Sequence, residues 1–346
     1  MSSPPASPLP SPRLAQKHPD RAPLALIGVP FGFGAGAGGC ELGAAAARLS
    51  GLVETLEAIG QPILDLGDIA GPKAPRPKAP RPKAPRPKPP GMGAIGNHVE
   101  QVSGWIGATH AAMFLALKSG SRPLLIGGDH SISMGSVSAA ARYAAETGKK
   151  LALLWIDAHA DFNTPETSPS GNLHGMSVAF LTGHPTLAGL LPDHDFPAVH
   201  AGDVTLIGAR SIDADEKAAI AAAGIHCLDM RAIDEFGVCA LMRQVLAGFD
   251  PARTHLHVSI DLDVIEPALA PGVGTPVAGG LSYREAHLIM EMLYESGLVC
   301  SAEFVELNPM LDHAGTTARL LVDLAASLFG KTISLAPSAR LTRMAG

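Results

Sequence analysis

The sequence predicts an α/β fold: a single doubly wound domain with a mainly parallel eight-stranded sheet and helices on both faces. Short apolar runs alternate with longer amphipathic or alanine-rich stretches along the 346 residues, and the apolar runs contain almost no polar alternation. Strands of that kind are buried on both faces, as a parallel sheet between two helical layers requires. We expect the domain to span residues 23–330, between a flexible Pro/Ser-rich leader at 1–22 and a tail at 331–346.

Alternating strands and helices are typical of βαβ units, so each apolar run is interpreted as a strand and each longer stretch as a helix. In chain order, the expected strands are 24–29, 62–66, 123–126, 151–156, 204–207, 225–228, 255–260 and 299–305. The expected helices lie near 41–59, 98–118, 134–146, 176–190, 214–223, 231–247, 282–296 and 314–329.

The composition excludes several classes of protein. The four cysteines show no CxxC spacing, which argues against a disulfide framework or a zinc–thiolate site and favours a reducing cytoplasm. No apolar run approaches the roughly 18 residues of a membrane span, and the N-terminus lacks the pattern of a signal peptide. We therefore expect a cytoplasmic protein that does not bind membranes.

One segment departs from the globular pattern. Residues 73–90 repeat Lys-Ala-Pro-Arg-Pro three times and end in Lys-Pro-Pro, and proline at this density blocks both helix and central strand. We expect a disordered, polyproline-II-like insertion. Because all of its charges are basic, the remainder is more acidic than the net charge of −6 indicates. That balance favours small cationic ligands over nucleic acid, and only the insertion leaves RNA or anionic-surface binding open.

Polar side chains stand directly after several predicted strands. Asp157, His159 and Asp161 alternate after the run 151–156, which directs them toward one face about 6–7 Å apart. Four other strands are followed by His130, by Asp213, by Asp261 with Asp263, and by Glu306. Since ligands bind at the carboxyl ends of the strands in such sheets, one site is predicted there.

Four aspartates and two histidines in one crevice would carry about four negative charges, which two divalent cations would neutralise. Oxygen-rich ligation without thiols favours manganese or magnesium over zinc, and the imidazoles favour manganese; cobalt, nickel and iron stay open. Two ions about 3.5–4 Å apart can lower the pKa of a bridging water and present hydroxide to an electrophile. Taken alone, Asp261 and Asp263 are also typical of helix caps, and His130 of a turn.

Three segments resemble the signatures of the ureohydrolases, the arginase/agmatinase family. They are Gly-Asp-His-Ser at 128–131, Asp-Ala-His-Ala-Asp at 157–161 and Ser-Ile-Asp-Leu-Asp at 259–263, and the resemblance runs from about residue 24 to 330. The Asn/Ser-rich stretch 163–175 is similar to arginases within that family, since agmatinases generally lack it. Shorter matches are 39–43, 272–276 and 306–309.

The resemblance implies hydrolysis of L-arginine to L-ornithine and urea by a hydroxide that bridges two manganese ions per subunit. It implies one ion on His130, Asp157, Asp161 and Asp261, and the other on Asp157, His159, Asp261 and Asp263. It also implies a homo-oligomer, either a trimer or a hexamer.

The same resemblance assigns the remaining roles. The implied catalytic residues are His174, Glu306 and Asp161, with His174 as proton shuttle and Glu306 as partner of the substrate guanidinium. The substrate α-carboxylate is assigned to Asn163, Ser168, Ser170 and Asn172, and the α-ammonium group to Asp213.

Three departures from the family pattern are visible. Glu266 stands where the third signature usually has another aspartate, and it is expected to tune metal affinity. Ser211 replaces an acid common in animal-type arginases, and Ala44 or a neighbour replaces a proline. Agmatine, guanidinobutyrate and formiminoglutamate stay open as alternative substrates.

An oxidoreductase is a remote alternative. Residues 34–39 satisfy the GxGxxG pattern of dinucleotide-binding proteins, between a predicted strand and a predicted helix. The acid expected about 20 residues further on, at the end of a second strand, is missing, because Glu54 and Glu57 fall within the helix. That function would also leave the metal-type cluster unexplained.

Overall fold

Eight parallel strands form one sheet in the order β2-β1-β3-β8-β7-β4-β5-β6. The computed structural model describes residues 22–35, 38–72, 96, 98–192 and 198–332. The strands are β1 (Leu24–Gly28), β2 (Ile63–Asp68), β3 (Arg122–Ile126), β4 (Lys150–Ile156), β5 (Val204–Ile207), β6 (His226–Leu228), β7 (Thr254–Asp261) and β8 (Val299–Val305). The predicted α/β fold is confirmed, and the sheet is parallel throughout. The basic insertion 73–90 and nearly all of the predicted leader and tail lie outside the described residues.

Helices connect the strands, as a parallel sheet requires. They are α1 (Gly43–Leu49), α2 (Leu52–Ala58), α3 (Val99–Lys118), α4 (Ser133–Glu146), α5 (Ser177–Leu181), α6 (Ala214–Ala223), α7 (Met230–Phe236), α8 (Val238–Ala247), α9 (Tyr283–Ser296) and α10 (Thr316–Leu328). Each is near a predicted position. Among these described helices, none combines the length and apolar character that crossing a membrane needs.

Three predicted helices are interrupted. Gly51 (φ 85°) separates α1 from α2, and Gly237 (φ 76°) separates α7 from α8. Both glycines hold left-handed backbone conformations that end a helix and that other residues adopt only with strain. The third predicted helix, 176–190, divides into α5 and a 3-10 helix at Pro185–Leu190, because the residue before a proline is driven out of the helical region.

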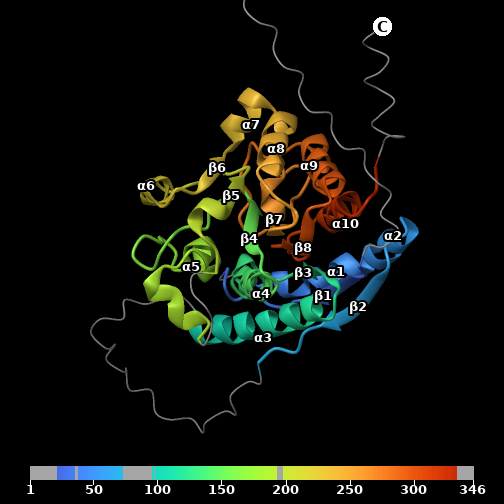
Figure 1. Ribbon diagram of the computed structural model, residues 1–346, viewed down its shortest axis with the longest axis horizontal. Coiled ribbons are helices and arrows are strands. Elements are labelled where there is room, and N and C mark those ends of the chain that lie inside the picture. Colours follow the sequence, from blue (N-terminus) through green and yellow to red (C-terminus); the bar gives the residue numbers. More distant parts are fainter. Residues whose placement is uncertain (1–21, 36–37, 73–95, 97, 193–197, 333–346) are drawn as a thin grey trace, which may run out of the picture. The chain divides into compact units, whose positions relative to one another are not determined.

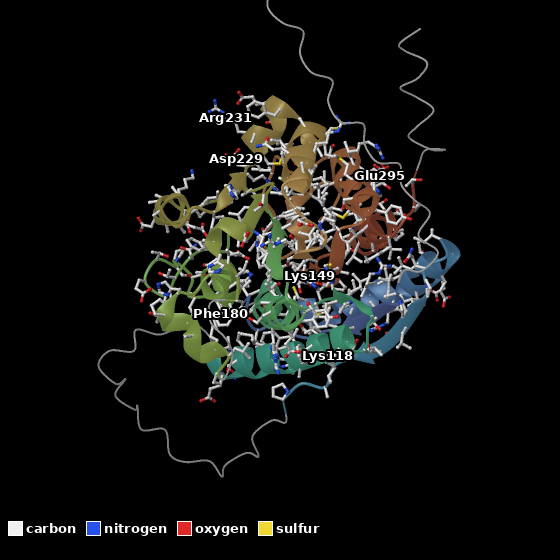
Figure 2. All side chains as sticks on the ribbon, in the orientation of Figure 1. Lys118, Lys149, Phe180, Asp229, Arg231 and Glu295 are labelled. Carbon is white, nitrogen blue, oxygen red and sulfur yellow. The ribbon has the colours of Figure 1, made fainter. Side chains whose placement is uncertain are left out.

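Helices cover both faces of the sheet (Figure 1). α3, α4 and α5 lie on one face, and α7 to α10 lie on the other together with α1 and α2. Alternate residues of each strand enter the two cores: Leu256, Val258 and Ile260 of β7 belong to the α9 and α10 side. Side chains fill both layers, with Phe180 in the interior and Arg231 at the surface (Figure 2).

The topology places four strand ends side by side. The chain runs outward from β1 to β2 and from β4 to β6, and then returns to insert β7 and β8 between β4 and β3. The register pairs Ile156 with Ile260, so Asp157 and Asp261 stand together just beyond the buried strands. This is the position at which an open parallel sheet binds its ligands.

Candidate metal centre

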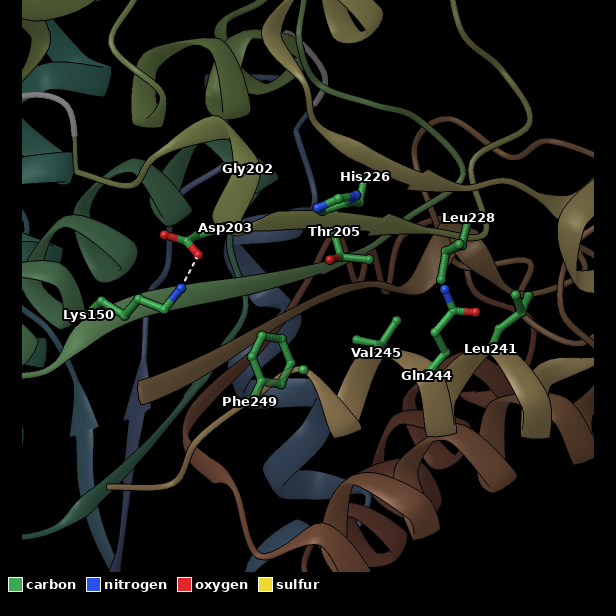
Figure 3. A pocket seen from close by; sticks show the side chains of 11 residues that line it. Lys150, Gly202, Asp203, Thr205, His226, Leu228, Leu241, Gln244, Val245 and Phe249 are labelled. Carbon is green, nitrogen blue, oxygen red and sulfur yellow. Dashed lines mark hydrogen bonds and ion pairs between the residues drawn. The ribbon is translucent and has the colours of Figure 1, made fainter. Parts of the chain in front are cut away.

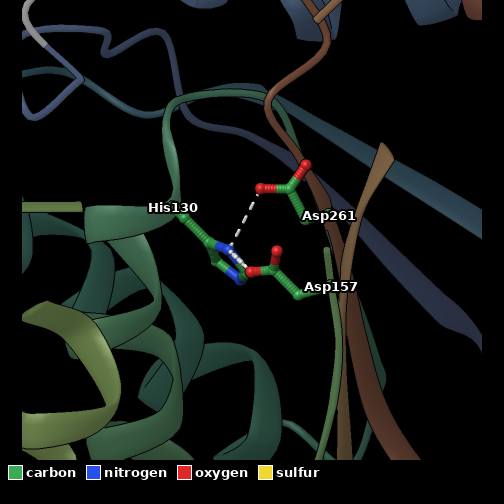
Figure 4. A group of neighbouring side chains, drawn as sticks. All are labelled: His130, Asp157 and Asp261. Carbon is green, nitrogen blue, oxygen red and sulfur yellow. Dashed lines mark ion pairs between the residues drawn. The ribbon is translucent and has the colours of Figure 1, made fainter. Parts of the chain in front are cut away.

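The structure brings His130 together with three aspartates from two other strand ends. Figure 4 shows two of them, Asp157 and Asp261, beside the imidazole. Its Nδ1 atom lies 3.0 Å from Asp157 Oδ2, and 3.3 Å from Oδ2 of both Asp161 and Asp261. All four side chains are buried. The imidazole stacks on Trp155, with the ring centroids 3.8 Å apart, which holds the ring at this angle.

The donor set fits a metal ion. His130 Nδ1 is buried and has no hydrogen bond of proper geometry to any described residue, although three carboxylate oxygens face it. The opposite ring nitrogen, Nε2, lies 2.8 Å from Ser259 Oγ. When Nε2 carries the hydrogen, the Nδ1 lone pair faces negative oxygens, and only a cation between them makes that arrangement favourable.

A second group adjoins the first. His159 Nδ1 lies 3.0 Å from Asp263 Oδ2 and 3.5 Å from Asp157 Oδ1. The possible ligand atoms of each group, His130 with Asp157 and Asp261, and His159 with Asp157 and Asp263, lie within 4.8 Å of one another. Asp157 belongs to both groups through different oxygens. The geometry can therefore hold two ions that share one carboxylate.

The spacing of the aspartates explains how they are aimed. In each motif the first aspartate uses Oδ1 to accept the backbone N–H two residues later: Asp157 from His159 at 2.7 Å, and Asp261 from Asp263 at 2.8 Å. This is the turn that an Asp side chain makes with its own backbone. Oδ2 of both residues is left to face His130.

Backbone strain is also concentrated here. Asp161 (φ 49°) and Glu306 (φ 63°) are two of four described non-glycine residues with a positive φ. Such conformations cost about 1–3 kcal/mol each and persist where the surrounding structure enforces them.

The aspartates repel one another strongly. Burial and the charges of Asp263 and Asp157 raise the pKa of Asp261 well above its ordinary value. Burial and the charge of Asp157 raise the pKa of Asp263 to about 6. Asp157 differs, because burial is outweighed by the two imidazoles beside it, those of His130 and His159, which lower its pKa. A cation at the centre would relieve this repulsion.

A cavity of about 110 Å³ opens beside the candidate ligands. It is lined by His159, Asp161, Asn163, His174, Gly175, Ser211, Asp213, Glu216, Asp261 and Thr275. Asn163 donates from Nδ2 to Asp213 Oδ2 at 3.0 Å, so these two predicted substrate contacts form a pair.

The other predicted carboxylate contacts lie outside that lining. Ser168 and Ser170 accept the N–H groups of Gly171 and Asn172, which shapes their own loop. Asn172 donates to the carbonyl of Ala35. Their contact with the substrate stays a prediction.

His174 and Glu306 form a buried pair beside the cavity. His174 Nδ1 lies 3.0 Å from Glu306 Oε1, which also accepts the His130 N–H at 2.9 Å. Burial opposes protonation of His174, but the hydrogen bond and charge of Glu306 outweigh it and raise its pKa to about 9. Glu306 Oε2 accepts a hydrogen bond from the Cys40 thiol at 3.3 Å.

Comparison with known proteins identifies the family. The model of the arginase family matches residues 22–330, nearly the whole described part of the chain. The chain belongs to the arginase family. Arginase from Agrobacterium fabrum is 41% identical over 308 residues, which cover 89% of this chain and 91% of that protein.

Solved arginase structures agree with the fold. Arginase from Bacillus caldovelox superimposes with a TM-score of 0.80 at 39% identity, covering 90% of this chain and 100% of that chain. Arginase from Bacillus subtilis gives a TM-score of 0.79 at 37% identity, with the same coverage.

Sequence reasoning missed several residues around the arginase-family signatures. Trp155 donates from Nε1 to Asp157 Oδ2 at 2.9 Å, and Ser259 contacts His130. Glu216 lines the cavity, where burial raises its pKa to about 7 and Asp161 adds to the effect. A signal for Glu216 was available: it stands three residues after Asp213, and the two form a capping box at the start of α6.

Two of the departures from the family pattern, Glu266 and Ser211, lie near the candidate site. Glu266 accepts the N–H groups of Gly279 and Gly280 at 2.8 and 3.0 Å and so holds that loop. Ser211 lines the cavity beside Asp213. In the glycine-rich loop, the Gly34 N–H donates to Asp129 at 2.6 Å, so the loop packs against the segment that carries His130.

A larger cavity, about 340 Å³, lies elsewhere, between α8 and strands β5 and β6 (Figure 3). Its ion pair joins Lys150 and Asp203, and Leu241, Val245 and Phe249 form part of its wall. The groups of candidate metal ligands found among the described residues are not in it. Candidate ligands such as His159 and Asp161 line the smaller cavity instead.

Proposed function

We propose that the protein hydrolyses L-arginine to L-ornithine and urea with two manganese ions per subunit. One observation carries the proposal: the buried His130 Nδ1 faces three carboxylate oxygens at 3.0–3.3 Å at the edge of a polar cavity. The substrate follows from family membership, since the relatives described above are named arginase.

One ion would be held by His130, Asp157, Asp161 and Asp261, and the other by Asp157, His159, Asp261 and Asp263. Oxygen-rich ligands with one imidazole each suit manganese. When bound, the two ions lower the pKa of a water and supply positive charge beside the reacting carbon.

The substrate would be held at both ends. Glu306 would attract the guanidinium group as a buried carboxylate, supported by the hydrogen bonds from His130 N and Cys40 Sγ. The Asn163–Asp213 pair would bind the amino-acid end, Asp213 receiving the ammonium group and Asn163 facing the carboxylate. Ser168, Ser170 and Asn172 would add contacts through water.

The proton transfers follow from the same geometry. Water oxygen bonds to the guanidinium carbon, the bond from that carbon to the side-chain nitrogen breaks, and this nitrogen leaves as the ornithine amine. Asp161 lines the cavity and is placed to accept a proton from the attacking water. Glu306 holds Nδ1 of His174, so His174 donates from Nε2 to the departing amine.

We also propose that the protein is cytoplasmic. The described cysteines, Cys40, Cys227, Cys239 and Cys300, are free thiols, as a reducing compartment allows. We also propose a trimeric or hexameric assembly, which sedimentation analysis would test.

Release of urea from arginine by manganese-loaded protein is the direct test. Agmatine serves as the comparison substrate, because it lacks the carboxylate that Asn163 is proposed to bind. Arginine should be strongly preferred, and metal-free protein should be inactive. Folded, manganese-loaded protein that releases no urea from arginine would exclude the proposed function, and a preference for agmatine would exclude the substrate assignment.

A further inference from the structure

Arg210 follows β5 and stands between the segments that carry the candidate ligands. Its backbone N–H and that of Ser211 both donate to the carbonyl of Ala158, at 2.8 and 3.0 Å. Ala158 lies between Asp157 and His159 in the sequence, so the backbone of Arg210 is fixed against that motif. Arg210 is partly buried, and it is not among the described residues that line the polar cavity.

The Arg210 guanidinium donates to backbone carbonyls of two other segments. Nη2 lies 2.7 Å from the carbonyl oxygen of Asp263 and 2.7 Å from that of Val277, and Nη1 lies 3.1 Å from that of Val264. Gly280 leaves room for this group, because a Cβ at that position would lie 2.7 Å from Nη2. The planar fork of an arginine can reach both segments at once.

The same two segments determine where the Asp263 carboxylate lies. Its Oδ2 is 3.0 Å from His159 Nδ1 and accepts a hydrogen bond from the Thr275 hydroxyl at 3.2 Å. Thr275 stands two residues before Val277 in the sequence. Arg210 therefore acts on Asp263 Oδ2 from two directions, through the Asp263 backbone and through the loop that supplies the hydroxyl.

The far end of this loop has an anchor of its own. Leu281 pairs with Ile265 as an isolated β-bridge, which does not involve the guanidinium. If the guanidinium were lost, this pairing would still hold the loop to the chain after Asp263. The contacts of Arg210 to Asp263 and Val277 are therefore a local constraint on the carboxylate, and the fold does not depend on them.

We propose that Arg210 is a positioning residue for the second candidate ion site, the one that includes His159 and Asp263. It holds Asp263 Oδ2 toward His159 by fixing the Asp263 backbone and the Thr275 hydroxyl. Outer contacts of this kind orient the residues that bind a metal directly. The inference rests on the proposed function, because that function assigns an ion to His159 and Asp263.

The test measures manganese binding to the full-length chain by isothermal titration calorimetry. Arg210→Lys keeps the charge but loses the planar fork, and Arg210→Met loses both. Arg122→Lys is the matched control: Arg122 is also a partly buried arginine that donates to a backbone carbonyl, that of Ala22 at 3.2 Å, but it begins β3 at the opposite edge of the sheet. Thermal unfolding of each metal-free variant shows whether it is folded.

We expect both Arg210 variants to weaken one of the two manganese sites by about 10–100-fold, as loss of an outer contact to a ligand does. The other site, on His130, should change less. At a manganese concentration that fills both wild-type sites, electron paramagnetic resonance should show isolated manganese in the variants and a coupled pair in the wild type. Arg122→Lys should behave like the wild type in both measurements.

The variant His159→Ala identifies which site is affected. It removes a ligand of the second site and leaves the site on His130. When Arg210→Lys is added to His159→Ala, the affinity of the remaining site should change by no more than about twofold, as expected for independent positions.

Wild-type manganese affinity in folded Arg210→Lys would overturn the inference and leave the proposed function intact, since the charge alone would then be enough. An equal loss in Arg122→Lys, or a loss of about 10–100-fold at the remaining site of His159→Ala, would also overturn it. If Arg210→Met does not fold, Arg210→Lys still decides. Wild-type protein that binds no manganese would overturn the proposed function and the inference together.

Discussion

Replacing Glu306 with glutamine is expected to lower the pKa of the His174 imidazole from about 9 to its ordinary value of 6.5 or below. The two groups lie 3.0 Å apart and both are largely buried. Glutamine keeps a hydrogen-bond acceptor at this place but removes the charge. Burial disfavours the imidazolium, and without the charge of Glu306 to oppose it, burial lowers the pKa of His174.

The size of the effect follows from the pKa values. A change of one in pKa corresponds to about 1.4 kcal/mol, so the fall is worth at least about 3 kcal/mol. At pH 8 about nine tenths of His174 is protonated in the wild type, against about 3% or less in the variant. In the wild type this stabilisation is fully present below pH 6.5 and is lost as the pH rises through about 9.

The assay is a titration of His174 by NMR between pH 5 and pH 10. Metal-free protein is used because a nearby cation would also lower this pKa. Glu266→Gln is the matched control, since Glu266 contacts the N–H groups of Gly279 and Gly280 and not His174. A His174 that still titrates near pH 9 in Glu306→Gln would refute the coupling, and with it the proposed source of the proton for the leaving amine.

Three further perturbations test other parts of the structure. Asn163→Asp places a carboxylate against Asp213 and the substrate carboxylate, so kcat/KM for arginine should fall by about 10–100-fold, and less for agmatine. Trp155→Phe keeps the ring on His130 but removes the donor to Asp157, and calorimetry should show manganese affinity about 10–100-fold weaker. His255→Gln should reduce the loss of stability between pH 7 and pH 5 by about 2 kcal/mol in urea unfolding.

The sign of the last prediction follows from burial. Burial and His257 lower the pKa of His255 to about 3, so below pH 6.5 the unfolded chain takes up a proton that the folded chain refuses. Stability is therefore lost as the pH falls from 6.5 toward 3. The exposed His200, changed to glutamine, serves as control. Equal pH dependence in wild type and His255→Gln, equal losses for both substrates in Asn163→Asp, or unchanged manganese binding in Trp155→Phe would contradict the respective prediction.

The fold could be predicted from the sequence because a strand that is buried on both faces is a short run of apolar residues. The interruptions of the helices were not, since Gly51 and Gly237 break the backbone while the apolar pattern continues on both sides. A single glycine within a helical pattern is often tolerated, so its position alone does not predict a break.

The candidate metal ligands could be predicted from the sequence for a similar reason. Parallel strands end at a common edge, so residues that follow the strands are brought together whatever their order in the chain. The aiming of Asp157 and Asp261 is also local, because each accepts the N–H two residues later. By contrast, the pairing of Asn163 with Asp213 spans 50 residues and depends on how two loops meet.

The residues that lie beneath His130 could not be predicted without the register of the sheet. Ser259 and Glu303 are neighbours only because β7 and β8 pair these two positions, and no local pattern in either strand fixes that pairing. In the sequence they interrupt apolar runs, which is a weak indication against a buried strand. In the structure these polar residues share one face of the strand: the face of β7 that carries Asp261 also carries Ser259 and His257. The buried polar residues of β7 therefore lie directly beneath the candidate metal centre, where Ser259 contacts His130.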